Sequence, residues 1–148
     1  MVQDTYEVGA EADDGGWYGS TFQTAGYGAR VGYYSSNYAH AFYRWDNIII
    51  PENAVIISAA VKVYVSSSNG TPNSRVYFAD SADPVAPKNA TEANAITKTT
   101  AYTQHDYLGT PMEWVEIDVK AQIEELFASY DYSRGEAMIA LFIGTSIS

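Results

Sequence analysis

The sequence predicts an all-β protein, a jelly-roll-like antiparallel β-sandwich with one short amphipathic helix. Three observations predict this class. Apolar and polar residues alternate over residues 39–65, which is the period of half-buried strands. Strand-like patterns return at 114–117 and 137–143, and only residues 119–130 carry apolar side chains at helical spacing. No internal repeat or linker is visible in the 148 residues, so we expect a single domain over residues 1–148.

The N-terminal part of the chain predicts short strands separated by glycines. Residues 5–8 form the first expected strand, and residues 11–16 form an acidic turn. Two further strands are expected at 17–22 and 30–34, where glycines indicate bends or close approaches of the backbone.

The middle of the chain predicts two longer strands joined through a proline corner. The first covers residues 39–46, and Pro51 marks the corner because it has no N–H to donate to a ladder. The pattern resumes at 55–65, where every second residue is apolar. Val61 is therefore expected to face the core and Lys62 to face water.

The C-terminal half predicts strands around a long excursion. Residues 75–79 form a strand, and 80–109 are expected to hold short strands or turns because structureless loops of this length are uncommon. Alternation returns at 114–117. Residues 137–143 are apolar at every position, which is typical of a central strand covered on both faces.

One helix is expected at about 119–130. Asp118 is placed to cap its first turn. Its apolar face is predicted to comprise Val119, Ile123, Leu126, Phe127 and Tyr130.

Composition excludes several classes of function. The net charge is −10 and the eight basic residues are scattered, whereas a nucleic-acid surface needs clustered Lys and Arg. Without cysteine there is no disulfide and no thiolate chemistry. No apolar run is long enough to span a bilayer, and the first residues show no secretory leader.

The sequence is rich in tyrosine, with thirteen in all. Tyrosine presents a broad, rigid ring with a polar tip, which suits protein interfaces and sugar binding. The alternative is that these rings cover sheet faces and strand edges. Trp45 and Trp114 are expected in the core. The residues predicted to make interface or glycan contacts are Trp17, Tyr18, Tyr27, Tyr33, Tyr34 and Tyr38, with Arg30 and Asn37 as hydrogen-bonding partners.

Catalysis is not expected. The two histidines, His40 and His105, have no nucleophile-elbow glycines beside a serine. Glu116 and Asp118 lie on one strand face at a spacing of about 7 Å, which an inverting glycosidase could use. A helix cap and an exposed strand residue explain these two carboxylates better, so no catalytic residue is predicted.

No cofactor is expected either, although calcium remains an alternative for the acidic turn. Oxygen ligands of the kind that Ca²⁺ prefers occur there, but their spacing lacks the full ladder of an EF-hand loop. A solvated turn without a metal is the prediction. The acidic residues concerned are Glu11, Asp13 and Asp14, with Asp4, Asp80 and Asp83 as further donors.

Several segments resemble the bacterial DNRLRE-type β-sandwich domains, which are related to carbohydrate-binding modules. The resemblance is carried by the opening residues 4–6, by "Ala-Phe-Tyr-Arg-Trp-Asp" at 41–46 and by "Ile-Pro-Glu-Asn-Ala-Val-Ile-Ile-Ser-Ala-Ala" at 50–60. The second half, from Trp114 to about Met138, is similar to a related group in bacterial surface and phage structural proteins. The resemblance implies a β-sandwich and specifies no ligand.

The chain departs from this family in two places. The insert at 11–38 has no clear counterpart, and the chain stops at Ser148 without the family's closing hairpin. A missing hairpin would leave an unpaired sheet edge that another chain could complete.

The function expected from these observations is a non-catalytic structural or decorating subunit of a virion or other extracellular assembly. Its partners would be other protein subunits, in a homo-oligomer, and its location a virion or extracellular surface. The alternative is a carbohydrate-binding module that recognises a polysaccharide through exposed aromatic residues. Neither function involves nucleic acid or membrane insertion.

Overall fold

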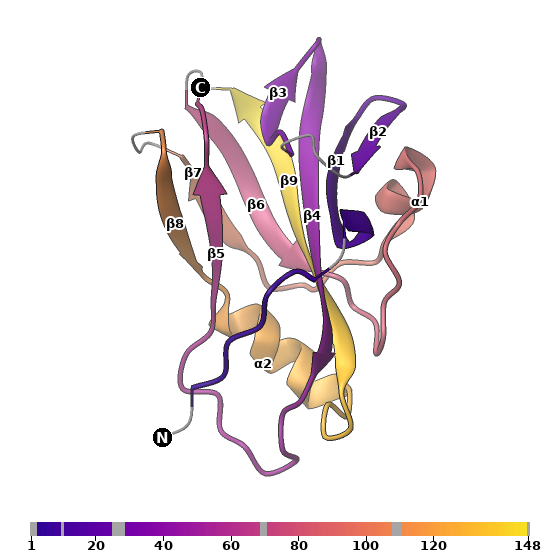
Figure 1. Cartoon of the computed structure of the whole chain (residues 1–148), viewed down its shortest axis with the longest axis vertical. Coiled ribbons are helices and arrows are strands. Elements are labelled where there is room, and N and C mark those ends of the chain that lie inside the picture. The colour runs from indigo at the N-terminus through magenta and orange to yellow at the C-terminus, as the bar shows by residue number, and fades with distance from the viewer. Residues whose placement is uncertain (1–2, 10, 25–28, 69–70, 108–110, 148) are drawn as a thin grey trace.

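The protein is an all-β sandwich of a seven-stranded antiparallel sheet and a two-stranded one (Figure 1). The computed structural model describes residues 3–9, 11–24, 29–68, 71–107 and 111–147. The larger sheet has the order β2-β1-β4-β9-β6-β7, with β3 also paired to β4, and β5 and β8 form the smaller sheet. The strands are β1 Asp14–Tyr18, β2 Thr21–Thr24, β3 Gly32–Tyr34, β4 Asn37–Ile48, β5 Ala60–Val65, β6 Pro72–Phe78, β7 Thr103–Asp106, β8 Glu113–Asp118 and β9 Glu136–Ile147.

The larger sheet is built around β4 and β9, which pair along most of their length. In β9, Met138 and Phe142 pack into the core between the two sheets, while Ile139 and Leu141 pack on the opposite face. Both faces are covered, so β9 carries no polar face. This confirms the prediction of a central strand at 137–143.

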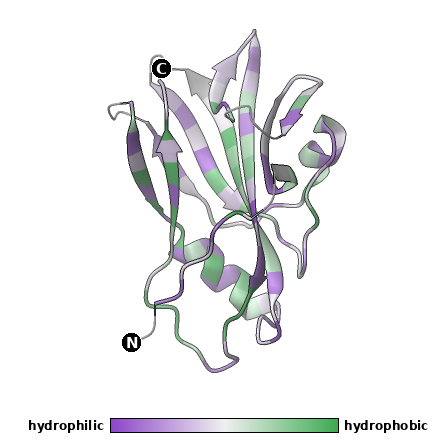
Figure 2. Ribbon diagram, in the orientation of Figure 1, coloured by the Kyte–Doolittle hydropathy of each residue, from purple (hydrophilic) through white to green (hydrophobic). Residues whose placement is uncertain are grey.

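Each face of the larger sheet has its own core. One face packs against the inner residues of β5 and β8 and against helix α2 (Lys120–Ser129). The other face packs against helix α1 (Ala90–Ala95) and the long segment around it. Figure 2 shows the hydrophobic residues along the central strands and alternating with hydrophilic ones in β5 and β8.

Helix α2 confirms the predicted amphipathic helix at about 119–130. The Asp118 carboxylate accepts a hydrogen bond of 2.9 Å from the backbone N–H of Lys120, although Val119 occupies the N-cap position itself. Val119 and Leu126 are buried, as expected. Gln122 is also buried on this helix, and its Nε2 donates to the carbonyl oxygen of Val76 at 2.8 Å.

The strand predicted at 55–65 begins only at Ala60. Val55 is 83% exposed, and no strand is formed over residues 51–59. The last backbone hydrogen bond beside the β5–β8 pairing runs from the Val119 N–H to the carbonyl oxygen of Ala59, at the point where β8 ends and helix α2 begins. The described part of β8 does not extend beyond this point, so residues 55–59 have no strand to pair with and do not form one.

Two N-terminal predictions are wrong. Residues 5–8 are not a strand; there the Tyr6 hydroxyl bonds with the backbone of Ile49 at 3.2 Å. Residues 17–22 are two strands, because β1 and β2 form a hairpin that turns at Gly19, whose φ is +55°. Glycine adopts this conformation without steric cost. The predicted acidic turn consists of the 3₁₀ helix η1 (Glu11–Asp13) and the start of β1.

The long segment at 80–109 contains the short strand β7, as expected, and also helix α1, a second helix that the sequence did not predict. Helix α1 begins after Asn89, whose side chain accepts a hydrogen bond of 2.8 Å from the backbone N–H of Glu92. The Glu92 carboxylate in turn accepts from the backbone N–H of Lys88. The Asn89 side chain thus satisfies one of the first free N–H groups of the helix, and the Glu92 carboxylate ties the residue before the N-cap to the first turn.

The chain's C-terminal strand is central, which corrects the expectation about the missing hairpin. β9 lies between β4 and β6, and the outer strands of the larger sheet are β2 and β7. A missing hairpin after β9 therefore does not create the sheet's edge. Neither described helix is long and apolar enough to cross a membrane.

Candidate functional site

Four tyrosines gather at one end of the larger sheet, on β1, β3 and β4. The two-residue loop between β3 and β4 consists of Ser35 and Ser36, both with positive φ, as a tight type I′ hairpin requires. This loop places Tyr33 directly opposite Tyr38 in the ladder. We call Tyr18, Tyr33, Tyr34 and Tyr38 the tyrosine tip.

The tyrosine tip consists of two edge-to-face pairs on opposite faces of the sheet, Tyr33 with Tyr38 and the partly buried Tyr18 with Tyr34. Tyr33, Tyr34 and Tyr38 are 45%, 41% and 50% exposed. The Tyr33 and Tyr38 ring centroids are 5.7 Å apart with an interplanar angle of 74°, and those of Tyr18 and Tyr34 are 5.0 Å apart at 76°. The guanidinium of Arg30 lies 4.1 Å from the centre of the Tyr34 ring. These contacts hold the rings in defined positions at the surface.

The two other predicted contact residues do not join this group. Trp17 is 2% exposed, which corrects its assignment as a surface residue: its ring lies 5.0 Å from that of His40, and its Nε1 donates to Asn94 at 2.9 Å. Tyr27 lies outside the described residues. Asn37, a predicted hydrogen-bonding partner, donates from its side chain to the carbonyl oxygen of Ser35 at 2.9 Å and so closes the loop.

The two tryptophans predicted to lie in the core have different environments. Trp45 packs against the core and stacks on Phe78, with ring centroids 6.4 Å apart. Trp114 is 69% exposed, so the prediction of a core role is wrong. The sequence did contain the relevant signal, because Trp114 alternates in phase with Glu116 and out of phase with the buried Ile117.

The two carboxylates considered for glycoside hydrolysis lie on an exposed strand face. Glu116 forms an ion pair with Lys62 at 3.5 Å, and Asp118 accepts the hydrogen bond from Lys120 at the start of α2. Glu116 and Asp118 thus have the roles that the sequence predicted for them, an exposed strand residue and a helix-capping group.

The two histidines, His40 and His105, lie on strands β4 and β7. His40 is partly buried, and burial is the first cause that lowers its pKa, followed by the positive charge of Lys98. Burial also lowers the pKa of His105, against the opposing effect of Asp106. The buried Ser74 hydroxyl donates to the backbone oxygen of His105 at 2.9 Å. This is not the serine-to-imidazole contact that nucleophilic catalysis uses.

The acidic residues of the predicted turn are separated by their contacts. Asp13 forms an ion pair with Arg44 at 3.1 Å, whereas Asp80 and Asp83 accept hydrogen bonds from the Tyr130 hydroxyl and the Ala137 N–H, both at 2.9 Å. Within the part of the chain that the structure describes, no three His, Cys, Asp or Glu residues form a group that could hold a metal ion.

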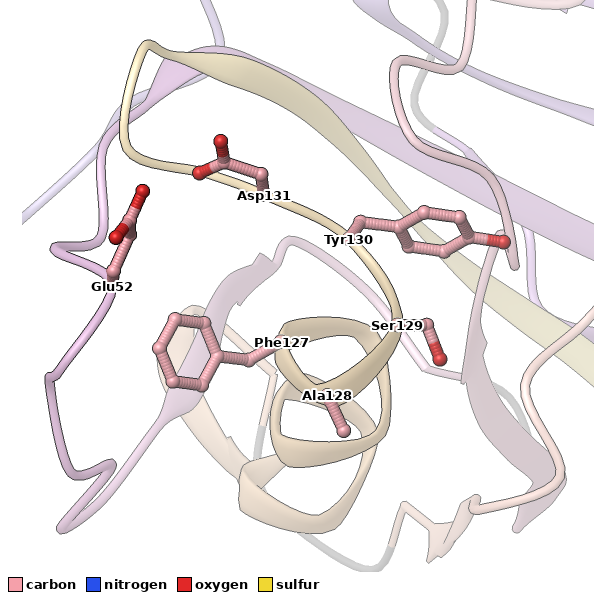
Figure 3. A pocket seen from close by; sticks show the side chains of 6 residues that line it. All are labelled: Glu52, Phe127, Ala128, Ser129, Tyr130 and Asp131. Atoms are coloured by element: carbon pink, nitrogen blue, oxygen red, sulfur yellow. The ribbon is translucent and has the colours of Figure 1, made fainter.

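Two hollows on the described surface are open to solvent. One lies at the end of α2, where the rings of Phe127 and Tyr130 point in opposite directions and Glu52 approaches from the loop after β4 (Figure 3). The second lies beside α1. Its lining is mostly apolar, but both hollows are open to solvent and lack the enclosed walls that small-molecule sites use.

Comparison with known proteins adds no family to this description. No family model, curated protein or solved structure matches the chain. The resemblance to DNRLRE-type domains therefore stays an expectation from the sequence.

Proposed function

We propose that the protein is a non-catalytic structural or decorating subunit of a virion or other extracellular assembly, and that the tyrosine tip is its contact with neighbouring subunits. The observation that carries this proposal is the two edge-to-face tyrosine pairs at the end of the sheet, in which Tyr33, Tyr34 and Tyr38 are exposed. Rigid aromatic side chains lose little entropy on binding and supply most of the energy of many protein interfaces.

The angles between the rings favour a protein partner over a sugar at the tyrosine tip. A flat platform for successive sugar rings would need roughly coplanar aromatic faces. Tyr33 and Tyr38 instead meet at 74°, and Tyr18 and Tyr34 at 76°. An edge-to-face pair on each face of the sheet offers no continuous flat surface, which suits packing against another protein surface better than stacking of successive sugar rings.

The hairpin that carries the tip also supports a contact role. Ser35 and Ser36 both have left-handed backbone conformations, which cost about 1–2 kcal/mol for residues other than glycine. This cost is incurred where the loop presents Tyr33, Tyr34 and Tyr38. Strain of this kind concentrates at functional positions.

The proposed setting rests on the sequence. The resemblance to domains of bacterial surface and phage structural proteins favours a virion or extracellular surface. The net charge of −10 disfavours binding to nucleic acid. A second copy of the chain is the simplest partner, because symmetric homo-oligomers are the commonest assemblies.

The test compares the double variant Tyr33→Ala/Tyr34→Ala with a matched control, Tyr102→Ala. Tyr102 is 46% exposed and lies outside the tip. Sedimentation equilibrium over a wide range of concentration should show self-association of the wild type and of the control. The double variant should remain monomeric while melting within a few degrees of the wild type, because the removed rings are exposed. A monomeric wild type that binds a polysaccharide through Tyr33 and Tyr34 would overturn the proposal in favour of a carbohydrate-binding module.

A further inference from the structure

The outer face of the two-stranded sheet presents a second aromatic group, which is separate from the tyrosine tip. Trp114 on β8 lies directly opposite Tyr64 on β5, with ring centroids 5.5 Å apart and an interplanar angle of 64°. The Tyr64 hydroxyl contacts the sulfur of Met112 at 3.7 Å. Trp114 and Met112 are each 69% exposed and Tyr64 is 46% exposed. The indole of Trp114 is thus held by one neighbouring ring and remains largely open to water.

Charged side chains continue this face along the same two strands. The next pair on the face is Lys62 and Glu116, whose Nζ and Oε2 atoms are 3.5 Å apart. Asp118 follows on β8, so that Trp114, Glu116 and Asp118 share the outer face over about 13 Å at the usual strand rise. We call Trp114, Tyr64, Lys62 and Glu116 the β5–β8 strip.

The order of groups along this strip indicates its ligand. The centre of a protein interface is depleted in Lys and Glu, yet these residues stand immediately beside the aromatic pair here. A sugar has the complementary chemistry: the C–H groups of one ring face can lie on an indole, while its hydroxyls donate to a carboxylate and accept from an ammonium group. Aromatic surface with a few charged hydrogen-bonding groups beside it meets both requirements.

Charge further narrows the class of sugar. The strip contains one positive charge, on Lys62, and one negative charge, on Glu116, and Asp118 adds a second negative charge next to it on β8, in a protein of net charge −10. An acidic polysaccharide would be repelled by this surface. Because Tyr64 meets Trp114 edge to face at 64°, only the indole offers a stacking face, for a single sugar ring. The strip lies on an open sheet face, so it can contact a polymer anywhere along its length and needs no chain end.

We propose that the β5–β8 strip binds a neutral polysaccharide, with a sugar ring on Trp114 and its hydroxyls hydrogen-bonded by Lys62 and Glu116. This site does not depend on the subunit contact proposed for the tyrosine tip. The two sites use different strands and different sheets.

Affinity electrophoresis tests the proposal with defined polymers. The full chain is run through native gels that contain a soluble β-glucan, a galactomannan, hydroxyethylcellulose, starch or, as the acidic probe, alginate. At least one neutral polymer should retard the wild type, and alginate should not. Trp114→Ala should lose retention at least tenfold, and Glu116→Gln and Lys62→Met should each weaken it several-fold. Trp114→Ala should still fold, because its ring is mostly exposed, and an unchanged melting curve checks this.

Two control variants separate this site from the other proposal. Tyr102→Ala removes another exposed ring, outside the strip, and should retain wild-type binding, as should Tyr33→Ala/Tyr34→Ala. No retention by any neutral polymer, or retention that is unchanged in Trp114→Ala, would overturn the proposal. A Trp114→Ala variant that instead dissociates an oligomer would identify the strip as a protein interface, and so would also overturn it.

Discussion

The Nδ1 atom of His40 accepts a hydrogen bond of 3.0 Å from the backbone N–H of Gly144, and so links β4 to β9 through a side chain. Because a backbone N–H can only donate, this contact requires Nδ1 to be unprotonated. The partial burial of His40 and the nearby Lys98 lower its pKa in the same direction.

Stability should therefore fall as pH decreases below about 6.5. The folded-state pKa of His40 is lower than the ordinary value of 6.5, so the unfolded chain binds the proton more readily. The full contribution of His40 is present above pH 6.5 and is lost progressively as the pH falls toward the folded-state value. His105, whose pKa is also lowered, contributes with the same sign.

Melting temperatures between pH 7.5 and 5 check this prediction. His40→Asn keeps an acceptor near the position of Nδ1 but does not titrate, so its melting temperature should depend less steeply on pH than that of the wild type. His105→Asn is the control that retains the contribution of His40. Identical slopes for the wild type and His40→Asn would show that His40 does not govern this pH range.

Adjacent substitutions in β5 should have very different effects. Val61 is buried and Lys62 is exposed, because they point to opposite faces of the strand. Val61→Asp should prevent folding, since burying an unpaired carboxylate costs an amount comparable to the whole stability of about 5–15 kcal/mol. Lys62→Gln should change the free energy of unfolding by less than about 1 kcal/mol. Soluble expression and urea denaturation measure both, and comparable stabilities would refute the assigned register.

Removing the hydroxyl of Tyr132 should not weaken the fold. This hydroxyl is buried without a hydrogen-bond partner among the described residues, and burial raises the pKa of Tyr132. Tyr132→Phe should be neutral or more stable by about 1 kcal/mol, because an unpaired buried polar group is removed. Tyr130→Phe is the matched control: it deletes the 2.9 Å bond to Asp80 and should lower the free energy of unfolding. Urea denaturation distinguishes them, and a destabilised Tyr132→Phe would contradict the expectation.

Arg44 should be important for stability because its guanidinium joins β4 to two other segments of the chain. Its guanidinium pairs with Asp13 at 3.1 Å and its Nε donates to the carbonyl oxygen of Pro84 at 2.8 Å, with about 15% of the side chain exposed. Arg44→Met should cost about 2–3 kcal/mol, since it leaves the partly buried Asp13 carboxylate unpaired. Asp46→Asn removes only an exposed partner at 3.6 Å and should cost less than about 0.5 kcal/mol. If thermal denaturation showed equal losses of stability for Arg44→Met and Asp46→Asn, the greater importance of the Arg44–Asp13 pair would be contradicted.

Much of the fold was predictable because its strongest signals are periodic. The apolar run at 137–143 predicted a strand covered on both faces, and Val61 beside Lys62 predicted a half-buried one. The spacing of Val119, Ile123 and Leu126 predicted helix α2. Each signal depends on side-chain direction along one element, which the local backbone geometry sets.

The candidate site was predictable only in part. Tyr33, Tyr34 and Tyr38 were expected at the surface and are exposed there. Trp17 was expected at the surface but is buried, and Trp114 was expected in the core but is exposed. Alternation shows which residues share a face of a strand. It does not show which face another layer of the protein will cover.

The sequence alone therefore determined the class of fold, the central strand and the apolar face of the helix, since these follow from the repeat of side chains along a single element. The tertiary structure decided where each ladder ends and which aromatic rings meet water. Val55 lies outside any strand because β8 ends and α2 begins before β8 could pair with it. Trp17 is buried because helix α1 packs over it, and its hydrogen-bond partner Asn94 lies 77 residues away in the sequence. Such outcomes depend on contacts between distant segments, which no local pattern of residues records.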